Sequence, residues 1–242
     1  MRFFRKIRRQ LLNENKFSNY SLYAIGEIVL VVIGILIALQ IDNWKDDQNL
    51  RKTEVALLKE MKNNLEADLI DLRWNINENK KILNANEIVL ESLKSQESYN
   101  DTLNFYYGNL LGGTYFLKNM SAYDNLKSIG FQIIKNDSLR FRITELYSTK
   151  YNYLDILEED FLDNFYWNNL HPLIMSNIIT DTTWVSAKPI NQMELAMNHE
   201  FKETIKRNME WLRFMINLYV EIEEEIGTLI NQIDSEIRNR NN

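Results

Sequence analysis

The 242-residue chain contains no cysteine, which excludes disulfide bonds, thiolate metal sites and a cysteine nucleophile. It has only two prolines and seven glycines, and neither residue type occurs between Gly34 and Gly108. Because both residues interrupt helices, their scarcity predicts long, unbroken helices.

Residues typical of catalytic sites are also scarce. His171 and His199 are the only histidines, and neither follows a carboxylate at the Glu-x-x-His spacing of helical di-iron sites. There is no nucleophile-elbow pattern and no phosphate-binding loop. The acidic runs at residues 158–163 and 221–225 are typical of solvated helix faces. We therefore predict that the chain is not an enzyme, and we assign no catalytic, metal-binding or cofactor-binding residue.

The charge is divided unevenly along the chain. Residues 1–20 carry six basic side chains and one acidic one, whereas residues 42–242 carry 22 basic and 32 acidic ones. Binding of DNA or RNA requires a basic face that neutralises phosphates. The acidic body therefore argues against a nucleic-acid partner.

One long apolar run is present, from Leu22 to Ile41, and Glu27 and Gln40 are its only strongly polar residues. A helix of this length spans about 30 Å, the thickness of the hydrocarbon layer of a membrane. We predict a transmembrane helix over residues 20–43. It is flanked by the interfacial aromatic residues Tyr20, Tyr23 and Trp44.

The flanking sequence predicts the orientation of this helix. The run ends in "IALQIDNW", which is a poor cleavage site, so we interpret the segment as an uncleaved signal anchor. The basic side stays in the cytoplasm, which places residues 44–242 in the periplasm of a bacterial inner membrane. Residues 1–19 would form an amphipathic helix on the lipid bilayer, or a disordered basic tail. The expected lipid contacts there are Arg2, Arg5, Lys6, Arg8 and Arg9.

Glu27 lies on the face of the predicted span that has the smallest side chains. That face consists of Ala24, Glu27, Val31, Gly34 and Ala38. Small residues four apart allow another helix to approach closely. A bare charge in hydrocarbon costs at least about 2.5 kcal/mol. We consider three roles for Glu27: packing against a second copy or a partner helix, reaching the interface, or carrying protons.

The rest of the chain has the periodicity of helices. We predict helices over residues 44–93, 101–111, 120–129, 138–170 (ending before Pro172) and 198–237, with a loop or extended segment at 178–190. The fold class is all-α: one N-terminal transmembrane helix continues into an elongated antiparallel helical bundle outside the membrane.

Aromatic residues concentrate in the part of the bundle expected to lie farthest from the membrane, residues 95–190. Residues 99–184 hold 17 of the 28 aromatic residues. They would form either a compact core or a pocket for a small molecule or a partner peptide. The candidates for such a pocket are Tyr106, Tyr107, Tyr115, Phe116, Phe165, Trp167 and Trp184.

Three stretches carry a resemblance to a known family: "FFRKIR", "LLNENKFSNYSLYAIGEIVLVVIGILIALQIDNW" and "YDNLKSIGFQIIKNDSLRFRITELY". They resemble an uncharacterised family of single-pass membrane proteins of Bacteroidota, defined by a domain of unknown function. The resemblance implies an inner-membrane protein with a periplasmic helical domain, and it supplies no catalytic residue.

The sequence thus predicts a membrane-anchored binding, adaptor or scaffold protein that forms a homo-oligomer or a complex with another membrane protein. An alternative follows from the layout of basic tail, single span with an acid, and exported domain. This layout is similar to stator-type subunits of ion-driven motors, in which an acid in the span carries the proton. The present chain differs in using glutamate and in lacking their peptidoglycan-binding or small α/β domain.

Overall fold

The computed structural model describes residues 17–95, 98–111 and 113–241. The chain divides into two compact units, Met1–Thr53 and Glu54–Asn242. The described elements are α2 (Phe17–Ser95), η1 (Asp101–Leu103), α3 (Asn104–Gly108), α4 (Ser121–Ile129), η2 (Phe131–Ile133), α5 (Asp137–Glu145), η3 (Leu146–Lys150), α6 (Tyr151–Asp160), η4 (Phe161–Leu170), α7 (His171–Asn177), β1 (Ile178–Thr182), β2 (Ser186–Pro189), α8 (Gln192–Met197) and α9 (His199–Asn241). The all-α prediction is confirmed, apart from one small hairpin.

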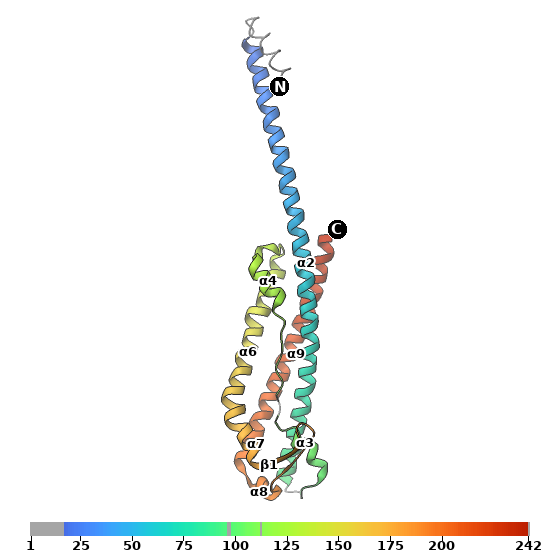
Figure 1. The fold of residues 1–242 in the computed structure, drawn as a ribbon, viewed down its shortest axis with the longest axis vertical. Coiled ribbons are helices and arrows are strands. Elements are labelled where there is room, and N and C mark those ends of the chain that lie inside the picture. The colour runs from blue at the N-terminus through green and yellow to red at the C-terminus, as the bar shows by residue number, and fades with distance from the viewer. Residues whose placement is uncertain (1–16, 96–97, 112, 242) are drawn as a thin grey trace. The chain divides into compact units, whose positions relative to one another are not determined.

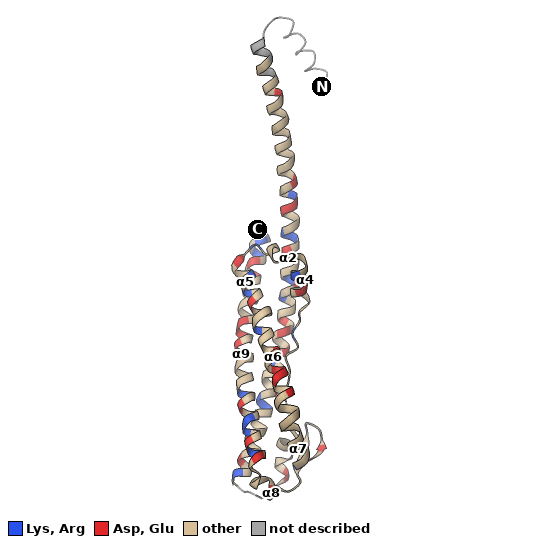
Figure 2. Ribbon diagram, turned by 90° about the vertical axis from the view of Figure 1, so that its left-hand side faces the viewer, with Lys and Arg blue, Asp and Glu red and all other residues tan. Residues whose placement is uncertain are grey.

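The first unit contains the apolar run as part of α2. Its large aliphatic side chains are exposed, for example Leu30 at 70%. Among the described residues, one helix is long and apolar enough to cross a membrane, and its most apolar part is not buried by any of them. Residues 22–41 are nearly free of charge, in contrast to the helices of the second unit (Figure 2). The length and composition of this part of α2 therefore fit a membrane span.

In the second unit, α2 and α9 run antiparallel and side by side (Figure 1). Ion pairs connect them at successive levels: Lys62 with Asp234 at 2.8 Å, and Arg213 with Glu87 at 2.6 Å. Their apolar stripes enter two hydrophobic clusters. The first surrounds Leu58, Leu65 and Tyr219, and the second surrounds Val89, Phe201 and Ile205, nearer the hairpin.

The third long run is helical from Asp137 to Asn177, through α5, η3, α6, η4 and α7. The Asn136 side chain accepts a hydrogen bond from the Leu139 N–H and so caps the start of this run. The prediction that this helix ends before Pro172 is wrong. Pro172 stands in the first turn of α7, directly after the π-helical residues 161–170. Proline is tolerated in the first turn of an α-helix, where its missing N–H would have no acceptor within the helix.

The end of the second unit opposite α4 contains α3, the β1–β2 hairpin and α8 (Figure 1). The prediction of an extended segment at 178–190 is confirmed by the antiparallel pairing of Ile178 with Pro189. The hairpin lies close to α3, since a Cβ atom at Gly108 would come within 2.8 Å of the Ser186 backbone nitrogen. At the other end, Gly130 follows α4 with φ 107°, a backbone angle that favours glycine.

Candidate functional site

Residues 113–120, here called the strap, run extended along the bundle between α3 and α4. An extended segment outside a sheet needs other acceptors for its N–H groups. Side chains of α2 provide them: Asn79 Oδ1 accepts from the Thr114 N–H, Asp71 Oδ2 from the Leu117 N–H and Asp68 Oδ1 from the Asn119 N–H, at 3.3, 2.9 and 2.7 Å. The strap is therefore bound to α2 mainly by side-chain acceptors.

A second helix holds the strap from its other side. Glu158 Oε1 on α6 accepts from the Phe116 N–H at 3.3 Å and from the Tyr219 hydroxyl of α9 at 2.6 Å. Lys118 pairs with Asp155, also on α6. Glu158 is buried, so the expectation that the acidic run at 158–163 is wholly solvated is wrong. Its burial follows from the two donors that reach it from distant parts of the chain.

Asp68 is the most enclosed acid of this site, with 1% exposure. Besides the strap, its Oδ2 accepts from the Tyr151 hydroxyl at 2.7 Å. Burial raises the pKa of Asp68 to about 6, although the Tyr151 hydroxyl and the Asn119 N–H favour the ionised form. Burial likewise raises the pKa of Glu158, against the hydrogen bonds from Tyr219 and Phe116. The site thus contains two acids whose charged forms are disfavoured by desolvation.

Aromatic rings form a chain beside Asp68. The Phe116 and Tyr151 ring centroids lie 5.2 Å apart, Tyr147 and Tyr151 lie 5.1 Å apart, and Tyr123 stacks on Tyr147 at 4.7 Å. The buried Tyr147 hydroxyl has no hydrogen-bond partner within the part of the chain that is described. These rings exclude water from Asp68, which is the physical cause of its raised pKa.

A small cavity lies at the level of Glu158. Its volume is about 10 Å³, which is room for about one water molecule. The residues lining it are Asn79, Gly113, Thr114, Tyr115, Glu158, Phe161, Trp211, Leu212, Met215 and Tyr219. Within the described ranges, no group of three or more His, Asp or Glu side chains could hold a metal ion.

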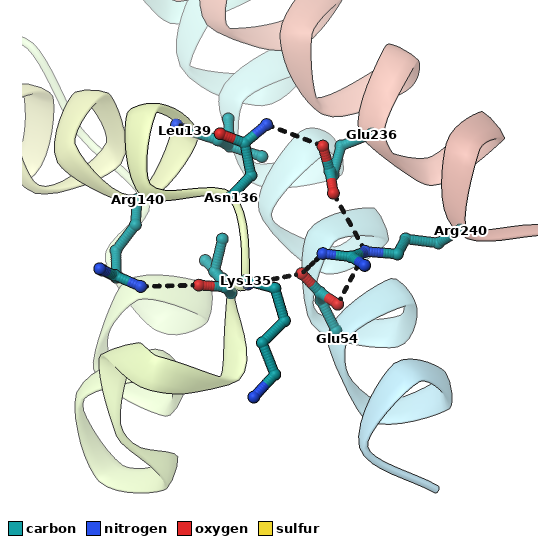
Figure 3. A network of polar contacts seen from close by, with 8 residues as sticks. Glu54, Lys135, Asn136, Leu139, Arg140, Glu236 and Arg240 are labelled. Carbon is teal, nitrogen blue, oxygen red and sulfur yellow. Dashed lines mark hydrogen bonds and ion pairs between the residues drawn. The ribbon is translucent and has the colours of Figure 1, made fainter. Parts of the chain in front are cut away.

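A second polar network fastens the C-terminal end of α9. The Arg240 guanidinium lies between two carboxylates, with Nε 3.1 Å from Glu54 Oε2 and 3.0 Å from Glu236 Oε1 (Figure 3). Glu54 Oε1 also accepts from the Lys135 N–H at 2.9 Å, and Glu236 Oε2 accepts from Asn136 Nδ2 at 2.8 Å. This network joins α2, α9 and the start of α5.

The predicted aromatic pocket residues are distributed over several surroundings. Phe116 belongs to the first hydrophobic cluster, whereas Tyr107, with Tyr106 and Phe165 packed nearby, belongs to the second. Tyr115 lines the small cavity. Trp167 and Trp184 are 54% and 51% exposed. The structure does not bring the seven residues together around one cavity.

The predicted membrane residues lie on or before α2. Ala24, Glu27, Val31, Gly34 and Ala38 recur three or four apart on this helix, and Trp44 is exposed. Tyr20 and Tyr23 belong to the same helix, but their side chains are outside the described part. Arg2, Arg5, Lys6, Arg8 and Arg9 also lie outside the described residues, as does nearly all of segment 1–19.

Sequence reasoning missed the strap and its acids. One signal was available, because Asp68 lies beside the apolar stripe of α2, three residues after the buried Leu65 and four before the buried Leu72. A polar residue in a core position requires partners inside the fold. The partners themselves, on the strap and α6, left no comparable local signal.

Comparison with known proteins identifies a family to which the chain is similar. The model of a "Family of unknown function (DUF6090)" matches residues 27–171, which is more than half of the chain. This range includes Glu27, the strap, Asp68 and Glu158, and it ends before α8 and α9. No curated protein and no solved structure matches the chain. The chain therefore belongs to the DUF6090 family of unknown function.

Proposed function

We propose that the chain is a membrane-anchored binding protein, an adaptor or scaffold, that acts through self-association or through a membrane-protein partner. Its α2 helix would cross the inner membrane with the N-terminus in the cytoplasm, and its bundle would lie in the periplasm. The observation that carries this proposal is the exposed apolar part of α2, which continues into a folded helical unit.

The apolar helix has room for another helix. A Cβ atom added at Gly34 would meet no atom within 4 Å. Gly34 and Ala38 are four apart, and close helix packing in membranes uses such pairs of small residues. Lipid would cover the remaining surface, while this face would receive a second copy or a partner helix.

The hairpin end of the bundle offers a second surface. Apolar side chains are exposed there on α3, on the turn between β1 and β2, and on α8. They include Phe105, Trp184, Val185, Met193 and Met197. Asn109 Nδ2 donates to the carbonyl groups of both Phe105 and Trp184, so two of these exposed residues lie close together. Concentrated exposed apolar residues mark interaction sites.

Cysteine cross-linking in native membranes tests self-association, since the chain has no cysteine of its own. Val31→Cys and Ala38→Cys, on the small-residue face, should form disulfide-linked dimers under mild oxidation. The matched controls Val29→Cys and Leu36→Cys lie on the opposite face of the helix and should not. Equal cross-linking on both faces would contradict packing through this face. Absence of cross-links, combined with recovery of the chain as a lone monomer from mild detergent, would contradict the proposal as a whole.

The stator-like alternative rests on Glu27 in the apolar helix. Glu27→Gln cannot exchange a proton, whereas Gly34→Leu blocks close helix approach. A binding role predicts that Gly34→Leu disrupts the complex and Glu27→Gln largely preserves both complex and cellular phenotype. Loss of the phenotype in Glu27→Gln with an intact complex would favour proton coupling instead.

A further inference from the structure

The strap uses acids where amides would suffice. Asn79 accepts from the Thr114 N–H with an uncharged amide oxygen. Asp68 and Glu158 do the same for Asn119 and Phe116 with buried carboxylates. A buried carboxylate adds a cost of desolvation that an amide avoids. What the acids add to the same hydrogen bonds is the ability to bind a proton.

We propose that the strap is a proton-controlled latch: it is held firmly when Asp68 and Glu158 are protonated and loosens when they ionise. Opening of the strap would free residues 113–120 from α2 and α6 and expose Phe116 with its aromatic neighbours. The bundle would therefore respond to the pH of its compartment.

The direction of the response follows from proton linkage. With the strap closed, the pKa of Asp68 is about 6, and opening admits water and returns it toward its ordinary value of 3.8. The closed state thus holds the proton more tightly, and opening releases it between these two values. Closure is favoured as pH falls below about 6 and is weakened as pH rises through it. The raised pKa of Glu158 acts in the same direction.

The charged and titratable groups that face the two acids come from the strap, from the acids' own helices and from the facing helices. The strap contributes Lys118, which lowers the pKa of both acids, and Tyr115. The helices that carry the two acids contribute Asp71, which raises the pKa of Asp68, and Asp155, which raises the pKa of Glu158. The facing helices contribute the hydroxyl groups of three tyrosines, Tyr147, Tyr151 and Tyr219. Desolvation is the largest cause for both acids, and it exceeds the opposing effects.

Hydrogen exchange of the full chain in detergent micelles tests the latch. Exchange of the amides in residues 113–120 is measured by mass spectrometry at pH 5.0 and 7.5 and corrected for the chemical exchange rate. Protection of the strap should be about tenfold greater at pH 5.0, from the shift of Asp68 alone. In Asp68→Asn this difference should largely vanish, whereas the variant Asp163→Asn, at an exposed acid, should retain it.

Two further variants separate titration from structure. Tyr151→Phe removes a donor that favours ionised Asp68, so the midpoint of the pH dependence should move to higher pH. A purely structural role would lower protection at every pH without moving the midpoint. Glu158→Gln should reduce the remaining pH dependence in the Asp68→Asn background. Equal strap protection at both pH values in the unmodified chain, or an unchanged dependence in Asp68→Asn, would overturn the proposal.

Discussion

Three buried acids, Glu54, Asp68 and Glu158, have the same role at the scale of single residues. Each accepts a hydrogen bond from the backbone N–H of a non-helical segment: Lys135 at 2.9 Å, Asn119 at 2.7 Å and Phe116 at 3.3 Å. These N–H groups have no place in a helix or sheet, and leaving them unpaired inside the fold would be costly. The three acids therefore fix the positions of the segments that connect the helices.

Glu54 differs from the other two acids because a cation neutralises it. We expect Arg240→Met to destabilise the second unit by about 2–3 kcal/mol, because it leaves the buried Glu54 and Glu236 carboxylates without their counterion. The free energy of unfolding, measured with urea, provides the test. Arg238→Met is the matched control, since Arg238 is exposed in the same turn of α9, and it should change stability by less than about 0.5 kcal/mol.

The double variant Glu54→Gln/Arg240→Met sharpens this prediction. Replacing the carboxylate by an amide keeps the acceptor for the Lys135 N–H and removes the unpaired charge. The double variant should therefore recover a part of the stability that Arg240→Met loses. If Arg240→Met is as stable as the unmodified chain, Arg240 does not act as the counterion inside the fold.

At the scale of elements, the scarcity of glycine and proline allows long helices, although it does not decide where each one ends. The helix α2 continues for 79 residues, and α9 for 43 with only Gly227 inside it. Gly130, in contrast, ends α4 with φ 107°. A side chain at that angle is strained, whereas a helical glycine such as Gly227 has an open position for a Cβ atom.

This contrast predicts opposite effects of one substitution. Gly130→Ala should destabilise the second unit by about 1–3 kcal/mol because alanine rarely adopts a positive φ. Gly227→Ala should stabilise it by up to about 1 kcal/mol because alanine is the better helix former. Thermal unfolding of the two variants under identical conditions would show the difference. A Gly130→Ala variant as stable as the unmodified chain would mean that the turn after α4 adopts another backbone conformation.

At the scale of the whole molecule, the two units have different surfaces. The first exposes an apolar helix, and the second has charged residues along its helices (Figure 2). The basic residues that precede the apolar run predict that the second unit is exported. A reporter enzyme that is active only in the periplasm should therefore be active when fused after Asn242. Activity at that position of a reporter restricted to the cytoplasm would show the opposite topology.

The sequence by itself determined the helical class, the apolar run and most helix positions. These properties depend on local features: the three-to-four spacing of residues such as Leu58, Leu65 and Leu72, the Asn136 cap, and the rarity of glycine and proline. The helix was predicted to end before Pro172. In the structure α7 follows the π-helical residues 161–170 and has Pro172 in its first turn, and hydrophobic periodicity does not reveal a π-helical segment.

Only the tertiary structure decided which acids are buried and which groups donate hydrogen bonds to them. Asp68 and Asp71 lie three residues apart on one helix and both accept from the strap, yet Asp68 is enclosed while Asp71 is only half-buried. The difference arises because Tyr151 and Asn119, more than fifty residues away in the chain, close over Asp68. Burial, and with it the pKa of an acid, depends on which distant residues surround it, and local sequence carries no record of those contacts.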